Sequence, residues 1–208
     1  DYNNLSITVN GCTSEEVWNI TLNDPAGYYE VTLGTSDAEI CLGETTTLAF
    51  TIDESSGATA PYTVVYLDEN GMTVTLPNYF SGTPLVIEPM MTNAVYTGVS
   101  VVDANGCSGT FNPGSGNTLS ITVNPLPVID IFGDASLCAG QSTATITAQS
   151  DNVSDWLWST GESDNEIVVD EAGTYTVTVT NTNGCVNENS FIVTENQPPS
   201  VFLAGGTE

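Results

Sequence analysis

The strongest constraint on the fold of this chain is an internal repeat, in which an alternating run is followed by an Asn-Gly pair and a cysteine. The three copies end in Cys12, Cys107 and Cys185. Alternation of β-branched and polar residues is typical of a half-buried strand, and Asn-Gly is typical of a tight turn. We therefore predict strands at residues 5–9, 96–102 and 175–179, each followed by a turn that carries a cysteine.

A second alternating run follows each of these cysteines, at residues 17–22, 119–123 and 190–194. The chain then reaches proline-containing segments such as residues 124–127 (Asn-Pro-Leu-Pro), where proline fixes φ, removes a donor and ends the strand. Cys41 and Cys138 next open threonine-rich alternating runs at residues 45–52 and 142–148. No helical period appears in any window of about 11 residues. The pattern predicts an all-β fold of tandem β-sandwich modules.

The repeat also predicts module boundaries. We expect residues 1–34 to be the C-terminal part of a truncated module, 35–126 and 127–197 to be complete modules, and 198–208 to be the first strand of another. The sequence begins without Met or a leader-like segment and stops after Gly205-Gly206-Thr207-Glu208. We therefore expect it to be a piece of a longer polypeptide.

Five cysteines fit this frame, because each complete module holds one before an early strand and one before its last strand. The frame predicts one disulfide per module, Cys41 with Cys107 and Cys138 with Cys185, as in small extracytoplasmic domains. Cys12 closes a truncated module, so its partner is expected upstream of residue 1. A zinc site is the alternative, but no Cys-x-x-Cys pair is present.

The charge of the chain excludes many functions. It has 26 acidic residues and no Lys, Arg or His, giving a net charge of −26. No imidazole base, Schiff-base lysine or guanidinium clamp is available, and nucleic acids and anionic lipids would be repelled. No apolar stretch is long enough to insert into a membrane. We expect no enzymatic activity, and we expect adjacent modules to repel each other into an extended arrangement.

The motifs resemble a known type of repeat. Residues 156–162 (Trp-Leu-Trp-Ser-Thr-Gly-Glu), 172–179 (Ala-Gly-Thr-Tyr-Thr-Val-Thr-Val) and 183–185 (Asn-Gly-Cys) are similar to the PKD-like and immunoglobulin-like repeats of giant Bacteroidetes surface proteins, including the SprB-type gliding-motility adhesins exported by the type 9 secretion system. The resemblance implies a secreted, filament-like adhesin on the outer membrane, without catalytic residues. Its implied partners are neighbouring repeats, a surface polysaccharide or other adhesion ligand, and the secretion and motility machinery.

The aromatic residues allow two interpretations. Trp156 and Trp158 lie two apart and share one face of a regular strand, where they form either core or a platform for a sugar ring. A carbohydrate-binding module of a secreted multidomain protein is therefore the alternative to an adhesive filament. Tyr96 and Tyr175 are expected to fill the sandwich and to hydrogen-bond the backbone, as in a tyrosine corner.

The acidic turns also have two interpretations. Turn carboxylates supply oxygen ligands for Ca²⁺, but Asp and Asn favour solvated turns without any metal. The candidates are Asp68, Glu69, Asp103, Asp151, Asp155 and Asp164. No other cofactor is expected.

Overall fold

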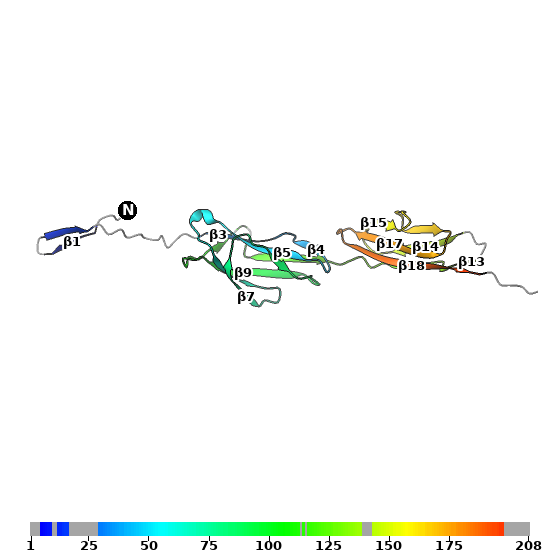
Figure 1. Ribbon diagram of the computed structural model, residues 1–208, viewed down its shortest axis with the longest axis horizontal. Coiled ribbons are helices and arrows are strands. Elements are labelled where there is room, and N and C mark those ends of the chain that lie inside the picture. The colour runs from blue at the N-terminus through cyan, green and yellow to red at the C-terminus, as the bar shows by residue number, and fades with distance from the viewer. Residues whose placement is uncertain are drawn as a thin grey trace, which may run out of the picture. The chain divides into compact units, whose positions relative to one another are not determined.

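The computed structural model describes residues 5–9, 12–16, 29–112, 114, 116–138 and 143–197, with only the backbone of the first two segments. These residues form strands and one short 3-10 helix, Glu54–Ser56 (Figure 1). The chain divides into two compact units. The first holds Asp1–Thr35, Leu48–Leu85 and Val95–Leu119, and the second holds Ser36–Thr47, Val86–Ala94 and Ser120–Glu208.

The first described strands form a hairpin by themselves. β1 (Leu5–Val9) pairs antiparallel with β2 (Cys12–Glu16), so that Val9 lies opposite Cys12. This confirms the predicted strand at residues 5–9. The strand predicted at 17–22 lies outside the described residues.

Two sheets follow, which we call the N-terminal sheet pair. One has the strand order β10-β3-β5-β8 and the other β4-β11-β9-β6-β7. The strands are β3 (Glu30–Thr35), β4 (Glu39–Cys41), β5 (Thr46–Ile52), β6 (Tyr62–Leu67), β7 (Thr73–Tyr79), β8 (Leu85–Ile87), β9 (Ala94–Val102), β10 (Thr110–Phe111) and β11 (Thr118–Asn124). Within the first compact unit, aromatic rings join the sheets, because Phe50 of β5 packs against Tyr66 of β6 and Tyr79 of β7.

The last strands form a second sandwich, which we call the C-terminal sheet pair. Its sheets have the orders β12-β14-β16 and β13-β18-β17-β15. The strands are β12 (Asp130–Gly133), β13 (Ser136–Cys138), β14 (Ala144–Gln149), β15 (Val153–Trp158), β16 (Glu166–Val169), β17 (Gly173–Asn181) and β18 (Val186–Asn196). Alternate residues of the strands meet in one core, which includes Ile146, Trp158, Ile167 and Val177.

The predicted all-β fold class is confirmed, and the alternating runs at 45–52, 96–102, 119–123, 142–148, 175–179 and 190–194 correspond to β5, β9, β11, β14, β17 and β18. The expected boundary between residues 34 and 35 falls inside β3, whose last residue, Thr35, pairs with Leu48 of β5. The residues beyond 197, expected to open a further module, lie outside the described part.

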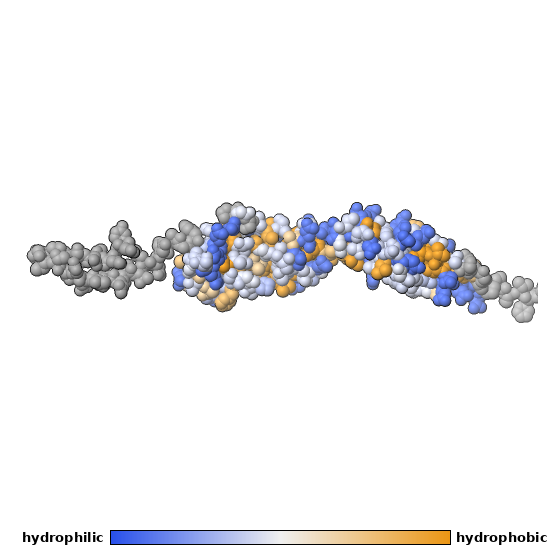
Figure 2. Space-filling view, turned by 90° about the horizontal axis from the view of Figure 1, so that it is seen from above, coloured by the Kyte–Doolittle hydropathy of each residue, from blue (hydrophilic) through white to orange (hydrophobic). Residues whose placement is uncertain are grey.

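The surface mixes polar and apolar residues. Figure 2 shows hydrophobic residues scattered among hydrophilic ones on the face in view, which is ordinary for a folded domain. Because the sequence contains no Lys, Arg or His, no side chain can form an ion pair with its 26 acidic groups. The described fold is therefore held by apolar packing, hydrogen bonds and one disulfide.

Candidate functional site

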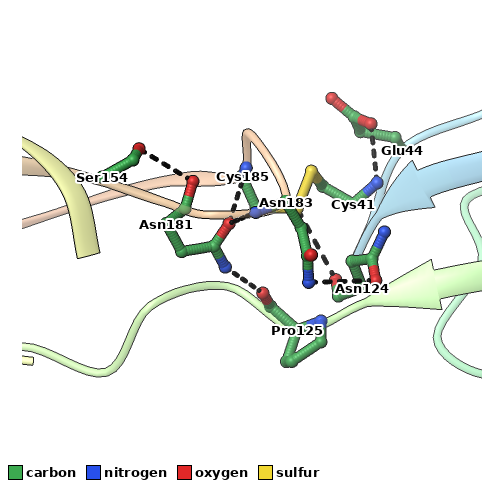
Figure 3. Close-up of a disulfide and its surroundings, with 8 residues drawn as sticks. All are labelled: Cys41, Glu44, Asn124, Pro125, Ser154, Asn181, Asn183 and Cys185. Atoms are coloured by element: carbon green, nitrogen blue, oxygen red, sulfur yellow. Dashed lines mark hydrogen bonds between the residues drawn. A yellow bond between two sulfur atoms is a disulfide. The ribbon is translucent and has the colours of Figure 1, made fainter. Parts of the chain in front are cut away.

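A disulfide joins the end of β4 to the turn between β17 and β18 (Figure 3). The sulfur atoms of Cys41 and Cys185 are 1.98 Å apart, and the Cα atoms are 5.6 Å apart. Both residues belong to the second compact unit. Cys41 is the last residue of β4, a strand of the N-terminal sheet pair, and Cys185 lies in a turn of the C-terminal sheet pair. The disulfide therefore links the two sheet pairs. We call this disulfide and its surroundings the joint.

The turn that carries Cys185 is organised by the side chain of Asn181. Its Oδ1 atom accepts hydrogen bonds from the backbone N–H groups of Asn183 and Cys185, each at 3.0 Å. Gly184 has a φ of 82°, in the left-handed region that favours glycine, which explains the Asn-Gly pair before the cysteine. Asn181 and Cys185 are both buried, at 6% and 0% exposure. The sequence therefore forms a rigid turn that fixes the position of the sulfur.

The strand end that carries Cys41 is fixed from both sides. Cys41 lies opposite Asn124 in the parallel pairing of β4 with β11, and the N–H of Leu42 donates to the carbonyl of Asn124 at 2.9 Å. The carboxylate of Glu44 accepts from the N–H of Cys41 at 2.8 Å. Across the joint, the amide of Asn183 donates to the side-chain oxygen of Asn124 at 3.2 Å.

The linker after β11 is held by three asparagine side chains. Asn181, Asn187 and Asn189 donate through Nδ2 to alternate carbonyls of the linker, those of Pro125, Pro127 and Ile129, at 3.0, 2.9 and 2.8 Å. Proline has no N–H, so the linker cannot form a full backbone ladder, and the asparagines satisfy its carbonyl groups instead. The linker is thereby ordered against the C-terminal sheet pair.

The disulfide pairing predicted from the sequence is wrong. Neither Cys41–Cys107 nor Cys138–Cys185 forms, and Cys107 and Cys138 are both free. One disulfide connects the opening cysteine of one predicted module with the closing cysteine of the next. The side chain of Cys12 lies outside the described part, so its upstream partner stays a prediction.

Strand geometry explains the error. Cys185 immediately precedes β18, whereas Cys138 lies opposite Asn196, the last residue of β18. A strand of 11 residues, at about 3.3 Å per residue, puts these cysteines about 35 Å apart. A disulfide needs Cα atoms within about 7 Å. A bond between Cys138 and Cys185 is therefore excluded.

The two tryptophans have different environments. Trp158 is buried in the core at 2% exposure, and its indole N–H donates to the carbonyl of Asp164 at 2.8 Å. Trp156 is half-buried and lines a groove of about 680 Å³ in the second compact unit. The core interpretation is thus confirmed for Trp158, and Trp156 remains a candidate for ligand contact.

The groove beside Trp156 is lined mainly by polar groups, which include Asp130, Asp151, Asn152 and Asn165. The hydroxyl of Ser150, on the same lining, is buried without a hydrogen-bond partner among the described residues. An indole beside carboxylates and amides offers both a stacking surface and hydrogen-bonding groups. Sequence reasoning found Trp156 but not Asp130 and Asn165, which come to the groove from other strands or loops.

Tyr96 and Tyr175 are both buried, as predicted, but the predicted backbone hydrogen bond forms at only one of them. The hydroxyl of Tyr175 donates to the carbonyl of Glu171 at 2.7 Å, which is the expected backbone bond. The hydroxyl of Tyr96 instead donates to the carboxylate of Glu69 at 3.2 Å. Burial and this acidic neighbour raise the pKa of Tyr96.

The acidic turns bind their own backbone. The carboxylate of Asp68 accepts from the N–H groups of Asn70 and Met72, and that of Asp103 accepts from those of Asn105 and Cys107. In the part of the chain that the structure describes, no three acidic or cysteine side chains gather as a metal site would require. Calcium stays a prediction, which a thermal melt with calcium and then with chelator tests.

The groups of the joint form one covalent bond and several hydrogen bonds between chain segments. No helix of the described segments has the length and apolar character needed to cross a bilayer.

Neither a protein-family model nor a curated protein matches this chain. Among solved structures, it is similar to three N-terminal domains of the highly immunogenic outer capsid protein of bacteriophage RB49, with 14% identity and a TM-score of 0.39, over 80% of this chain and 59% of that one. It is also similar to the C-terminal 282-residue fragment of intimin bound to the intimin-binding domain of its translocated receptor, with 8% identity and a TM-score of 0.49, over 78% and 63% of the two chains. A third similar structure is SGBP-B of the Bacteroides ovatus mixed-linkage glucan utilization locus, in complex with a mixed-linkage heptasaccharide, with 16% identity and a TM-score of 0.28, over 75% of this chain and 42% of that one. The chain thus spans less than two thirds of each of these three structures.

Proposed function

We propose that this chain is a structural and adhesive repeat segment of a secreted cell-surface protein. Its joint transmits load between consecutive sandwiches, and it performs no catalysis. The observation that carries this proposal is the Cys41–Cys185 disulfide, which ties one sheet pair to the next instead of closing a single sandwich. The division into modules at residues 1–34, 35–126, 127–197 and 198–208 belongs to this proposal.

Redox chemistry supports a location outside the cytoplasm. A structural disulfide persists in an oxidising compartment and is rare where glutathione keeps thiols reduced. In addition, trypsin-like proteases find no cleavage site in this sequence, because it contains no Lys or Arg. Both properties suit a protein exposed at the cell surface.

The contacts of the joint support a mechanical role. A force applied along the chain across residues 124–129 meets a covalent bond and three asparagine hydrogen bonds before the linker can extend. A surface filament used for adhesion needs this resistance. The resemblance of the repeats to SprB-type adhesins supports a role in gliding motility, export by the type 9 secretion system and attachment at the outer membrane.

The proposal is tested on intact cells that produce the full-length protein. Antibodies against residues 29–197 are expected to bind without lysis, and the double variant Cys41→Ser/Cys185→Ser is expected to remain on the surface but to lose adhesion under shear flow. Val168→Ala, at a residue 58% exposed, is the matched control and is expected to adhere normally. Detection only after lysis, with Cys41 and Cys185 reduced, would refute the proposal.

The groove beside Trp156 favours a second function, the binding of a surface polysaccharide in a non-catalytic carbohydrate-binding module. The half-buried indole provides an apolar face for a sugar ring, and Asp130 and Asn165 provide hydrogen-bonding groups. A neutral glycan is favoured over an acidic one, because the chain has no cation to offset an anionic ligand.

A glycan array of neutral polysaccharides tests this function. Binding is expected to fall at least about tenfold in Trp156→Ala and in Asp130→Asn, a loss of about 1.4 kcal/mol. Leu157→Ala, next to Trp156 but 53% exposed on the other face of β15, is the control and is expected to bind normally. Absence of binding to any neutral glycan, or equal binding by all three variants, would exclude this groove as a sugar site.

A further inference from the structure

The two free cysteines occupy the same places in the repeat as the two that are bonded. Cys138 ends β13 and lies opposite Asn196, the last residue of β18, just as Cys41 ends β4 and lies opposite Asn124, the last residue of β11. Both pairings are parallel. The end of β13 at Cys138 therefore has the same strand pairing as the end of β4 at the bonded Cys41.

The correspondence extends to the surrounding bonds and sequence. The N–H of Thr122 donates to the carbonyl of Ala38 at 2.8 Å, and the N–H of Thr194 donates to the carbonyl of Ala135 at 3.0 Å. Each cysteine is followed by one residue, a glycine and then Glu44 or Gln141, and each facing asparagine is followed within two residues by proline. Cys138 is exposed, so its thiol is accessible.

Cys107 matches the other half of the joint. Its turn is organised by Asp103, whose Oδ1 atom accepts from the N–H groups of Asn105 and Cys107 at 2.9 and 2.7 Å, as Asn181 does for Cys185. Gly106, with a φ of 86°, takes the place of Gly184. Asp103 is 6% exposed, as Asn181 is. Each free cysteine thus belongs to a half-joint whose counterpart in this same chain is bonded.

We propose that Cys107 and Cys138 each form a disulfide with a neighbouring repeat, so that the Cys41–Cys185 joint recurs along the protein. Cys138 bonds the cysteine of an Asn-Gly-Cys turn in the following repeat. Cys107 bonds a cysteine that ends a β4-like strand in the preceding repeat. This inference rests on the proposed function, since it requires tandem repeats in an oxidising compartment.

The chemistry balances as an oxidation of thiols. For each bond, two thiols lose two protons and two electrons as one S–S bond forms. A disulfide of a thiol–disulfide exchange catalyst accepts the electrons and protons and is reduced to two thiols. The accessible thiol of Cys138 suits attack on such a disulfide.

Disulfide mapping of the full-length native protein tests the proposal. The protein is alkylated without reduction and cleaved at Asp and Glu, which places Cys138 in the peptide 135–151 and Cys107 in the peptide 104–130. We expect peptide 135–151 to be linked to an Asn-Gly-Cys peptide from beyond residue 208, and peptide 104–130 to a peptide from before residue 1. Alkylated Cys138, or a bond between Cys107 and either Cys138 or Cys12, would overturn the inference.

The same experiment separates this inference from the proposed function. If Cys41–Cys185 is found while Cys138 is alkylated, the surface repeat stands and the recurring joint fails. If all of these cysteines are alkylated, the oxidising location fails as well.

A tandem extension gives an independent test. A second copy of residues 125–197 is placed directly after Asn196 of the full chain, which recreates the Asn-Pro sequence of the joint. Cys138 of the first copy is expected to become resistant to alkylation, and the matched control with Cys185→Ser in the second copy only is expected to keep it reactive. Intact Cys41–Cys185 in both proteins confirms folding, and equal reactivity of Cys138 in both would overturn the proposal.

Discussion

The segments that lead into the two sheet pairs are both held at alternate carbonyl groups, but by different donors. In the N-terminal pair the donors belong to the backbone. The N–H groups of Thr110 and Asn112 donate to the carbonyls of Tyr29 and Val31 at 2.9 and 3.0 Å, and β10 thereby pairs parallel with β3.

In the C-terminal pair the donors belong to side chains. The amides of Asn187 and Asn189 donate to the carbonyls of Pro127 and Ile129 at 2.9 and 2.8 Å. β18 pairs with β17 and β13, so its backbone groups are engaged in its own sheet.

The difference shows how one repeat accommodates two linkers. In the N-terminal pair, the strand after the cysteine is β10, which joins the sheet of β3, so backbone groups alone hold the incoming segment. In the C-terminal pair, the strand after the cysteine is β18, which stays in its own sheet. There, asparagine side chains reach the proline-containing linker instead. The cores differ as well, since the N-terminal pair buries a cluster of tyrosines and the C-terminal pair buries Trp158 among aliphatic residues.

The largest expected difference between the two regions is in alkali. Burial, with the carboxylate of Asp103, raises the pKa of Tyr29 to about 12, and burial with the hydrogen bond to Glu54 raises that of Tyr62 to about 12. The folded state holds these phenolic protons more tightly than the unfolded chain does. The protonated phenols therefore contribute fully to the free energy of unfolding below pH about 10, and this contribution is lost as the pH approaches 12. As the pH is raised, we therefore expect the N-terminal pair to unfold before the C-terminal pair, whose described core cluster contains Tyr175 as its one tyrosine.

Tyrosinate absorbance follows the N-terminal pair in this titration. Fluorescence in a Trp18→Phe background follows the C-terminal pair through Trp156 and Trp158. A rise in tyrosinate absorbance and a change in tryptophan fluorescence at the same pH would contradict the difference between the cores.

Removal of the buried indole is the next largest effect. Trp158→Ala is expected to destabilise the C-terminal pair by about 3–5 kcal/mol, because it leaves a cavity in the core and removes the bond to Asp164. Leu157→Ala, one residue away and exposed, is expected to change stability by less than about 0.5 kcal/mol. Urea unfolding followed by far-ultraviolet circular dichroism measures both, and equal effects would refute the assignment of core and surface faces.

The disulfide connects the two regions. Cys41→Ser is expected to lower the free energy of unfolding by about 2–4 kcal/mol, because it releases a cross-link between residues 144 apart in sequence. Cys138→Ser, at a free and exposed thiol, is the control and is expected to have little effect. Calorimetry under non-reducing conditions measures the change, and destabilisation by Cys138→Ser alone would contradict the pairing.

The smallest effect concerns the linker. Asn187→Ala and Asn189→Ala are each expected to cost about 1 kcal/mol, since each leaves a linker carbonyl without its donor. Asn112→Ala removes two exposed side-chain bonds, one donated to Glu30 and one accepted from the N–H of Gly114, but keeps the backbone bond to Val31, so it is expected to cost less. Hydrogen exchange and urea unfolding compare the three, and a larger effect of Asn112→Ala would reverse the assigned roles of side chain and backbone.

Local patterns predicted the strands well, because alternation and Asn-Gly turns act over a few residues. The runs at 96–102 and 175–179 became β9 and β17, and Gly106 and Gly184 adopt the turn conformation expected of them. The pairing of the cysteines depends on which strands lie side by side, which spacing along the chain does not reveal. Parallel pairing of the opening strand with the last strand would have placed Cys138 at the far end from Cys185.

The groove shows a similar limit. The spacing of Trp156 and Trp158 predicted a shared face correctly, but not that only Trp158 would be fully buried. Trp156 lies at the border of the core, packed against it, and lines the groove together with residues of the linker. Such features arise from tertiary packing and have no local signature.

Non-reducing peptide mapping of this chain tests the inter-sandwich joint most directly. Cleavage at Asp and Glu places Cys41 in peptide 40–44 and Cys185 in peptide 172–188. The structure predicts that these two peptides are recovered as one cross-linked species that separates on reduction. Recovery of peptide 40–44 bonded to peptide 104–130, or of peptide 135–151 bonded to peptide 172–188, would show that each sandwich closes on itself and that no covalent joint exists.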